Sequence, residues 1–391
     1  MLKLITNVRI VDGGQIAEGG LLLSEGKVAA ILPPGTLIPE AQVIDGQGLY
    51  ASAGFIDMHT HGAGGADFMD GTKEAYLTAC RMHLIHGTTT IFPTTLSGAR
   101  SEILRSIDAY HEALPELSRT QFVPGLHLEG PYFSMEMRGG QDARYVRDPA
   151  PDEYTEILER ADGAIARWSV APEKEGALEL GDVLTKHGIL ASIGHTSATY
   201  DEVKAAMAHG YSHITHLYSC TSSIVRKGGF RILGVTEAAY ALEDLDVEII
   251  ADGCHLPPEL IRMIVRLKGT DKVSLITDSL RPTGLDVLTT RIGSNEDGYD
   301  VIIEDGVAKL PDRSAFAGSI ATADRLVRTV WKKAGIPLPD VIRMMCETPA
   351  RIMKIDGRKG RLTPGMDADI VLFDEDVTVK AVYYMGEEVP R

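Results

Sequence analysis

Eight short apolar runs, most of them followed by a helix-like segment, are the feature that most constrains how this chain can fold. Strands that alternate with helices are typical of parallel βα units. Residues 200–209 show the helical part well, because their apolar positions are spaced by three and four. Eight such units predict an α/β fold, a (β/α)8 TIM-like barrel. The runs are GFIDMHTHG, TTTIFPTT, FVPGLHLEG, IARWSVAPE, LASIGHTS, HITHLYS, VEIIADGCH and KVSLITDS.

The two ends of the chain have a different pattern. Residues 1–53 alternate apolar and polar positions in short segments broken by Gly and Pro, which predicts a small antiparallel sheet. Residues 355–391 have the same pattern, so we expect both ends to pair in one small β-sandwich domain that is discontinuous in sequence. Residues 54–354 would then form the barrel, and 391 residues suffice for both parts.

Composition restricts the partners and the compartment. The net charge of -16 argues against nucleic acid or an anionic membrane, because the protein would repel phosphate at long range. No run approaches the roughly 20 apolar residues that a spanning helix needs, and the N-terminus lacks a signal-peptide core. The four cysteines lie far apart without CxxC spacing, which argues against disulfides and a thiolate zinc site. We therefore expect a cytoplasmic protein.

Polar residues with metal-binding chemistry lie at or near the ends of these runs. The carboxyl ends of the strands of such a barrel meet at one mouth, so the residues are expected to converge. Imidazoles and a carboxylate are the usual ligands of a catalytic divalent ion. A capping carboxylate or a core histidine would explain any single case, but several coincident cases favour a metal site. The candidate ligands are His59, His61, Glu129, His195 and His216. His59 and His61, at i and i+2, would point to the same side of one strand.

Asp278 ends the eighth run without a ligand partner of its own. A carboxylate beside a metal site could take a proton from water and return it to a leaving group. The alternative is an aspartate that caps the following turn.

His255 ends the seventh run and is predicted to hydrogen-bond the substrate. The other histidines considered are predicted to be structural: His83, His86, His127 and His213.

Over nearly its whole length the chain resembles the N-acetylglucosamine-6-phosphate deacetylases of the amidohydrolase superfamily. The motifs that carry the resemblance include GFIDMHTHG, HGTTTIFPT, GLHLEGPYF, GHTSATYDEV, ADGCH, ITDS, FAGS and GRLTPGMDADIVLFD. The resemblance implies that Glu129, His195 and His216 hold the principal metal and that Asp278 is the catalytic acid and base. It also implies that His59 and His61 can hold a second ion.

The chain departs from the family pattern in two loops. Gly140, Gln141 and Asp142 stand where the family usually has Thr-His-Asn. Gln141 therefore replaces the histidine that would contact the substrate. Ser219 and Cys220 replace an Asn-Ala pair. Arg226 or Lys227 takes the place of an arginine that meets the sugar phosphate, sometimes across a dimer interface. The predicted substrate contacts are Gly140, Gln141, Ser219, Cys220, Arg226, Lys227, His255, Ala317 and Gly318.

The resemblance implies metal-dependent hydrolysis of N-acetylglucosamine-6-phosphate to glucosamine-6-phosphate and acetate, by a homodimer. The basic cluster of Arg226, Lys227 and Arg231 fits a phosphorylated substrate, although it could be a solvated loop. Other substrates stay open: N-acetylgalactosamine-6-phosphate, a non-phosphorylated sugar, or a cyclic or peptide-like amide. A non-catalytic binding protein is a further alternative, against which the complete ligand set argues. The ligands suit zinc first, or iron, manganese or cobalt, with one or two ions per subunit.

Overall fold

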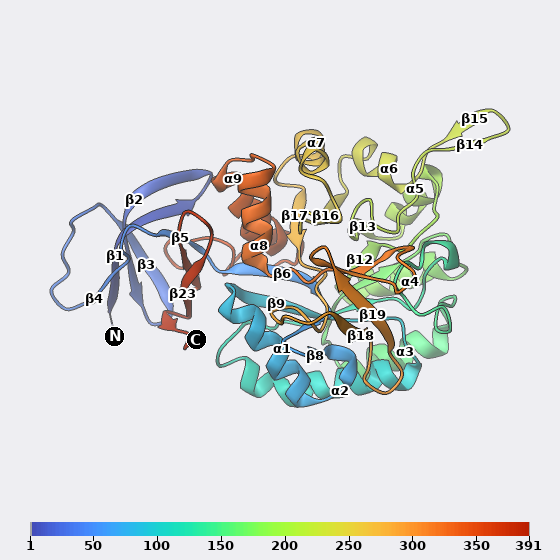
Figure 1. The fold of residues 1–391 in the computed structure, drawn as a ribbon, viewed down its shortest axis with the longest axis horizontal. Coiled ribbons are helices and arrows are strands. Elements are labelled where there is room, and N and C mark those ends of the chain that lie inside the picture. The colour runs from blue at the N-terminus through green and yellow to red at the C-terminus, as the bar shows by residue number, and fades with distance from the viewer. Residues whose placement is uncertain (1, 391) are drawn as a thin grey trace.

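A computed structural model describes residues 2–390, and its centre is a barrel of eight parallel strands (Figure 1). Each predicted run overlaps one barrel strand, so the predicted α/β barrel is confirmed. The strands follow one another around the barrel in chain order, and the last meets the first where the Asp278 N–H donates to the His59 carbonyl at 2.9 Å. The strands are β6 (Phe55–Thr60), β9 (Thr88–Thr95), β10 (Leu126–Glu129), β11 (Ile165–Val170), β12 (Leu190–Ile193), β13 (Tyr211–Ile214), β16 (Asp246–Ile250) and β17 (Val273–Ile276).

Helices surround the barrel, with α1 to α3 on one side and α5 to α7 on the opposite side in Figure 1. Helix α5 begins at Tyr200, the first residue of the predicted helical segment. Thr199 and Glu202 form a reciprocal capping box at this N-terminus. Further bounds are α1 (Lys73–Ile85), α2 (Arg100–Leu117), α3 (Pro151–Ala161), α4 (Ala177–Lys186), α5 (Tyr200–Ala208), α6 (Val235–Ala241), α7 (Pro258–Lys268), α8 (Ala323–Arg328), α9 (Leu338–Ile342) and α10 (Thr348–Ile352). Short helical turns are η1 (Phe68–Asp70), η2 (Met135–Met137), η3 (Thr329–Lys333) and η4 (Arg343–Glu347). Within residues 2–390, no helix has both the length and the apolar composition of a membrane span.

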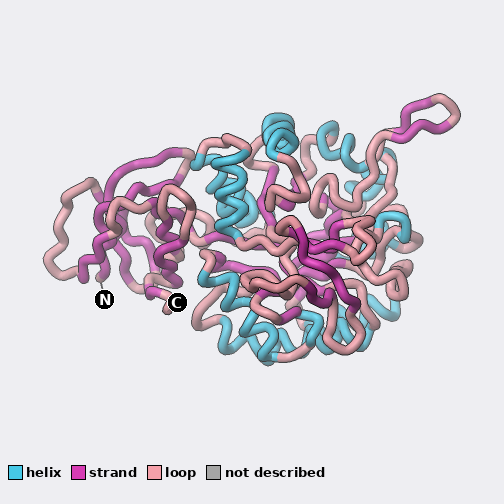
Figure 2. The backbone as a smooth tube through the Cα atoms, viewed as in Figure 1, coloured by secondary structure: helices cyan, strands magenta, loops and turns pink. Residues whose placement is uncertain are grey.

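Strands from both ends of the chain form one sheet beside the barrel, at the left of Figures 1 and 2. The predicted pairing of the two termini is therefore confirmed, whereas the domain boundaries stay a prediction. The sheet is mixed and not purely antiparallel, because β1 runs parallel to both β4 and β5. Its strands are β1 (Lys3–Asp12), β2 (Gln15–Ser24), β3 (Lys27–Leu32), β4 (Gln42–Asp45), β5 (Tyr50–Ala53), β22 (Ile370–Phe373), β23 (Val379–Tyr384) and β24 (Glu387–Glu388).

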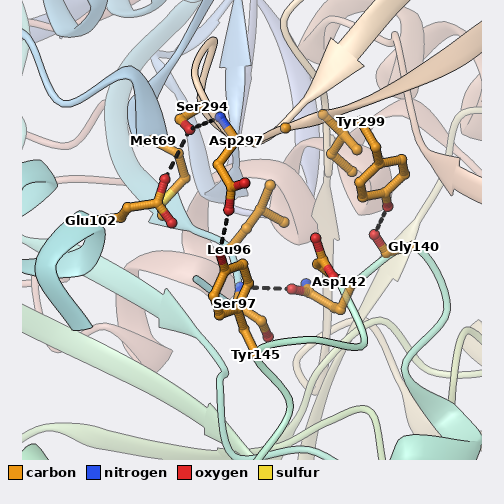
Figure 3. Close-up of a pocket in the computed structure, with 14 residues that line it drawn as sticks. Met69, Leu96, Ser97, Glu102, Gly140, Asp142, Tyr145, Ser294, Asp297 and Tyr299 are labelled. Carbon is orange, nitrogen blue, oxygen red and sulfur yellow. Dashed lines mark hydrogen bonds between the residues drawn. The ribbon is translucent and has the colours of Figure 1, made fainter. Parts of the chain in front are cut away.

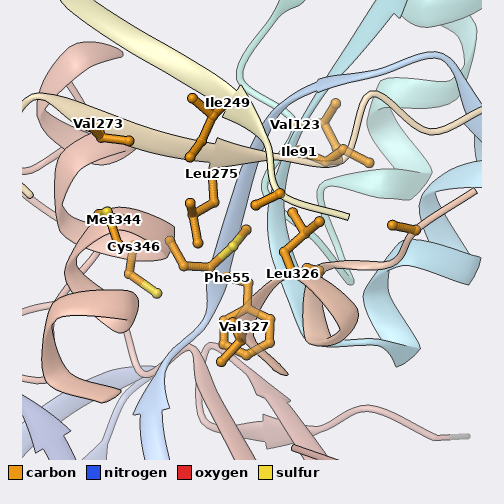
Figure 4. Packing of buried hydrophobic residues seen from close by; sticks show 14 of the residues in the cluster. Phe55, Ile91, Val123, Ile249, Val273, Leu275, Leu326, Val327, Met344 and Cys346 are labelled. Atoms are coloured by element: carbon orange, nitrogen blue, oxygen red, sulfur yellow. The ribbon is translucent and has the colours of Figure 1, made fainter. Parts of the chain in front are cut away.

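The core continues from the barrel to the layer beneath it. Phe55 of β6 and Leu275 of β17 pack with Val327 and Met344 of the C-terminal helical segments (Figure 4). All four side chains are fully buried. This packing holds the first and last barrel strands together below the mouth.

Between β17 and α8 the chain forms an antiparallel insert that the sequence pattern did not reveal. Its strands are β18 (Thr289–Ile292), β19 (Tyr299–Glu304), β20 (Val307–Lys309) and β21 (Phe316–Gly318). Ile292 and Val301 of the insert pack with Leu96 and Leu280, which follow barrel strands β9 and β17. The insert therefore covers part of the barrel mouth.

Two small hairpins complete the fold. Strands β7 (Gly62–Ala63) and β8 (Ala66–Asp67) pair beside the mouth. Strands β14 (Val225–Lys227) and β15 (Phe230–Ile232) form a hairpin that projects from the body of the molecule, at the upper right of Figure 1. Every residue of this second hairpin is exposed except Ile232, which is partly exposed.

Candidate metal centre

The barrel brings all six predicted chemical residues to one place at its mouth. The Glu129 carboxylate lies at the centre, since its Oε1 is 3.1 Å from His195 Nε2 and 2.9 Å from His216 Nε2. The same carboxylate is within reach of the β6 pair, with Oε2 3.2 Å from His61 Nε2. Two groups of possible ligands therefore share Glu129: one with His59 and His61, the other with His195 and His216. In each group the ligand atoms lie within 4.8 Å of one another.

The orientation of the imidazoles fits a divalent cation. His195 Nδ1 donates to the Met137 carbonyl at 2.9 Å, and His216 Nδ1 donates to the Ser219 carbonyl at 3.0 Å. A carbonyl can only accept, so Nδ1 carries the proton in each ring and the Nε2 lone pair is left for a metal. The two Nε2 atoms are 3.1 Å apart and face the same carboxylate oxygen. Two nitrogens and one oxygen thus converge as a cation requires.

The electrostatics of the site also favour a bound cation. Burial by itself would lower the pKa of His59, but the nearby carboxylates, Glu129 and Glu248 first, raise it to about 9. Burial opposes charge on His61 too, and Asp278 and Glu129 raise its pKa to about 10. The pKa of Glu129 lies well below its usual range, because the surrounding imidazoles outweigh its burial. The carboxylates therefore create a strong demand for positive charge at this point.

Asp278 lies across the site from Glu129, with its Oδ1 3.1 Å from His61 Nε2 and 3.4 Å from His59 Nε2. Burial favours the neutral acid, but these two imidazoles lower the pKa of the carboxyl group, so the ionised form prevails near neutral pH. Asp278 has no side-chain capping bond to the turn that follows among the described residues. Its position is that of a proton acceptor facing the same space as the ligands.

Three of these residues adopt left-handed backbone conformations just beyond their strands: His195 at φ 47°, His216 at φ 27° and Asp278 at φ 46°. Residues other than glycine rarely adopt such angles, and they are concentrated at functional sites. The turn aims each side chain from the strand end into the mouth. His195 and His216 lie two residues past β12 and β13, so the sixth run, HITHLYS, extends beyond its strand and His216 lies outside that strand.

Sequence reasoning missed two charged residues inside the barrel. Arg167 of β11 and Glu248 of β16 are fully buried and form a bidentate ion pair, with Nη1 to Oε2 at 2.5 Å and Nη2 to Oε1 at 2.8 Å. Glu248 also accepts a hydrogen bond from His59 Nδ1 at 2.8 Å. This bond leaves His59 Nε2 facing the site. The available signal was a charge within each apolar run, IARWSV and VEIIA.

The remaining histidines make structural contacts below the site or away from it. His127 Nε2 is 2.7 Å from Ser169 Oγ, and His213 Nδ1 is 2.7 Å from Ser192 Oγ. His83 contacts Thr60 Oγ1 at 2.9 Å. His86, at the end of α1, pairs with Asp324 of α8. His255 differs, because it borders the open space at the mouth while its Nδ1 is held by Asp252 at 2.9 Å.

A cavity of about 270 Å³ opens above the ligands. Its wall includes seven predicted substrate contacts: Gly140, Gln141, Ser219, Cys220, His255, Ala317 and Gly318. Arg226 and Lys227 are elsewhere, on the projecting β14–β15 hairpin (Figure 1). Within residues 2–390, no arginine or lysine lines the cavity. Asp142 is next to the wall, and its carboxylate pairs with Arg144 at 2.6 Å.

Comparison with known proteins identifies the family. The model of the amidohydrolase family matches residues 50–389. The chain belongs to the amidohydrolase family. Among its relatives in this family, the N-acetylglucosamine-6-phosphate deacetylase of Lysinibacillus sphaericus is 30% identical over 97% of this chain and 96% of its own. The enzyme of the same name from Bacillus subtilis is 30% identical over 96% and 94% of the two chains.

Solved structures of amidohydrolases with the same name have the same fold. A mutant N-acetyl-D-glucosamine-6-phosphate deacetylase from Mycobacterium smegmatis, in complex with N-acetyl-D-glucosamine-6-phosphate, matches with a TM-score of 0.89 and 30% identity, covering 99% of both chains. The deacetylase from Pasteurella multocida matches with a TM-score of 0.91 and 28% identity over all of both chains. The resemblance stated from the motifs is therefore confirmed over the full length.

Proposed function

We propose that this amidohydrolase removes the acetyl group of N-acetylglucosamine-6-phosphate, giving glucosamine-6-phosphate and acetate. The observation that carries the proposal is the convergence of Glu129, His195 and His216 on one point of the cavity, with Asp278 facing it. Relatives of that activity align with nearly the entire chain. These three ligands would hold the principal divalent ion, zinc first among the candidates, and His59 and His61 would hold a second.

The reaction needs a proton acceptor that later becomes a proton donor. A bound divalent ion would polarise the amide carbonyl and make water more acidic. Asp278, ionised at neutral pH, takes one proton from the water that adds to the carbonyl carbon. It then gives that proton to the amide nitrogen as the C–N bond breaks, so acetic acid and the free amine leave and Asp278 is ionised again; the acid loses its remaining proton to water and becomes acetate. His255 and the backbone at Ala317 and Gly318 would orient the sugar, whereas the amide of Gln141 already bonds Ser97 and Glu129.

The phosphate needs cations that this cavity does not contain within the described chain. We propose a homodimer in which the β14–β15 hairpin of one subunit reaches the cavity of the other. Arg226 and Lys227 would then contact the phosphate, with Arg231 beside them on the paired strand. The hairpin's exposed apolar side chains, such as Phe230 at 77% exposure, would be covered in the same contact. A sugar phosphate crosses no bilayer unaided, which favours the cytoplasm.

The chemistry is tested by Asp278→Asn, with Asp286→Asn as the matched control because Asp286 is exposed and away from the cavity. Acetate release from N-acetylglucosamine-6-phosphate should fall by about 10²–10⁴-fold in the first variant and stay unchanged in the second. Metal content should be equal in both. Near wild-type turnover of the Asp278 variant, with metal bound, would end the assignment.

The substrate is tested with a panel of N-acetylglucosamine, N-acetylgalactosamine and their 6-phosphates. The Arg226→Ala/Lys227→Ala variant should raise KM for phosphorylated sugars only, whereas Arg119→Ala/Lys186→Ala, on other exposed surfaces, should not. Light scattering should give a dimer for the wild type. Equal turnover of phosphorylated and free sugars, unaffected by the hairpin variant, would favour a non-phosphorylated substrate.

A further inference from the structure

Gln141 differs from the other residues that line the cavity, because the protein itself occupies both ends of its amide group. The side chain is only 3% exposed. Its Oε1 accepts a hydrogen bond from the Ser97 backbone N–H at 2.7 Å. Its Nε2 donates to Glu129 Oε2, also at 2.7 Å. Gln141 thus connects the chain segment after β9 to the central carboxylate of the candidate metal centre.

The partners allow only one orientation of this amide. A backbone N–H can only donate, so it must face the amide oxygen, and an ionised carboxylate can only accept, so it must face the NH2 group. A flipped amide would place two acceptors together at Glu129 and two donors together at Ser97. The hydrogen bond to Glu129 is also charge-assisted, which makes it shorter and stronger than a neutral one.

The two oxygens of Glu129 consequently have separate tasks. Oε1 faces His195 Nε2 and His216 Nε2, at 3.1 and 2.9 Å. Oε2 receives the Gln141 amide at 2.7 Å and is 3.2 Å from His61 Nε2. Without that bond the carboxylate could turn about its last torsion, because such torsions are broad and cost little energy. Gln141 therefore sets which oxygen is presented to the two histidines.

The loop that carries Gln141 is itself clamped from several sides. The Gln141 N–H donates to the Arg138 carbonyl at 2.9 Å, and Arg138 Nη1 donates to the Gln141 carbonyl at 3.0 Å. The Tyr299 hydroxyl of the insert donates to the carbonyl of Gly140 (Figure 3). Gly140 lies so close to Ala317 that an added Cβ would be 3.1 Å from its Cα. The insert and the barrel rim thus keep the Gln141 amide within hydrogen-bonding distance of Glu129.

Two more contacts fasten the insert to the rim beside this loop. Ser294 Oγ donates to Glu102 at 2.9 Å, and the Tyr145 hydroxyl donates to Asp297 (Figure 3). The space left between the two parts is a cavity of about 30 Å³, enough for one or two water molecules and too small for a sugar. These contacts between the insert and the rim therefore hold the Gln141 loop in place.

We infer that Gln141 is a positioning residue for the metal ligand Glu129. The inference rests on the proposed metal centre and deepens it. The amide does more than fill space, because its NH2 group donates to one oxygen of Glu129 while the other oxygen faces His195 and His216. Partners that orient metal ligands typically change metal affinity by about 10–100-fold when they are removed. The insert would then contribute to metal binding through this loop, although it supplies no ligand of its own.

The test replaces the amide with a side chain of the same length that cannot donate, Gln141→Met. The matched control is Gln121→Met, because Gln121 is also buried and donates from Nε2 to the Thr88 carbonyl at 2.6 Å, away from the metal centre. Zinc affinity of the metal-free proteins is measured by competition with a chromophoric chelator. The visible spectrum of the cobalt-loaded proteins reports the coordination geometry.

We expect zinc affinity to fall by about 10–100-fold and the cobalt spectrum to change in Gln141→Met, with neither change in Gln121→Met. Circular dichroism establishes that both variants are folded, and if Gln141→Met is not, Gln141→Leu is measured in the same way. Equal zinc affinity and an unchanged cobalt spectrum would overturn the inference. If the wild type binds zinc but releases acetate from none of the sugars, the proposed function fails while the positioning role stands.

Discussion

The ion pair between Arg167 and Glu248 allows a quantitative test of how the barrel supports the candidate metal centre. Both side chains are fully buried, and Glu248 has a second partner in His59 Nδ1. Replacing Arg167 by Met removes the guanidinium group but keeps most of the volume. Glu248 then remains as a buried carboxylate that accepts hydrogen bonds from the His59 imidazole at 2.8 Å and from the His216 backbone N–H at 3.3 Å.

The expected magnitude follows from this geometry. Removing one partner of a buried ion pair costs about 3–5 kcal/mol, because the other charge is left in a medium of low dielectric constant. Since His59 still pairs with Glu248, we expect Arg167→Met to cost about 3 kcal/mol. The Arg167→Met/Glu248→Leu double variant removes both charges and leaves His59 Nδ1 without an acceptor, for which about 1–3 kcal/mol is expected. The double variant should therefore be no less stable than the single one.

The pH dependence gives a second signature. Burial would raise the pKa of Glu248, but Arg167 and His59 lower it far below the ordinary value of 4.5. The stability that this carboxylate contributes is therefore complete above its unfolded pKa and is lost as the pH falls toward the folded pKa. In Arg167→Met the pKa of Glu248 should rise, so the penalty of the substitution should shrink as the solution is acidified.

The assay is urea unfolding of the metal-free proteins, followed by circular dichroism at pH 7 and pH 5. Arg160→Met is the matched control, because Arg160 forms an exposed ion pair with Asp108, at 2.5 Å, that should contribute less than about 1 kcal/mol. The reasoning is refuted if Arg167→Met is no more destabilising than this control. It is also refuted if the losses of Arg167→Met and Glu248→Leu simply add in the double variant.

Three further predictions concern other parts of the molecule. Burial lowers the pKa of His83 to about 4, so the unfolded chain takes up the proton first and about 3 kcal/mol of stability should be lost between pH 6.5 and pH 4. His83→Gln should remove this part of the pH dependence of urea unfolding, and an unchanged profile would contradict it. Phe55→Ala should cost about 3–5 kcal/mol in the same assay, because Phe55 is fully buried, whereas Phe230→Ala on the exposed hairpin should stay within about 0.5 kcal/mol. Removing metal with a chelator should lower the melting temperature and added zinc should restore it; identical melting curves would count against a bound ion.

Much of the fold was predictable because it depends on local pattern. Strand periodicity and the intervening helical segments were enough for the eight barrel strands, and the similar pattern at both ends predicted their shared sheet. The insert over 289–318 was not predicted, because its strands are short and follow turn-rich sequence. The parallel pairing of β1 with β4 and β5 also depends on how the chain crosses over, which periodicity does not report.

By itself the sequence determined the barrel and the candidate ligands near its strand ends, so Glu129 and Asp278 could be named before their neighbours were known. Tertiary structure alone decided which atoms meet. Gln141 and Glu129 are twelve positions apart, yet their contact depends on a loop clamped by the insert. Arg167 and Glu248 are 81 positions apart and pair only because β11 and β16 face the same barrel interior. Such contacts are set by how strands and loops are arranged in space, which the residue order along one strand does not encode.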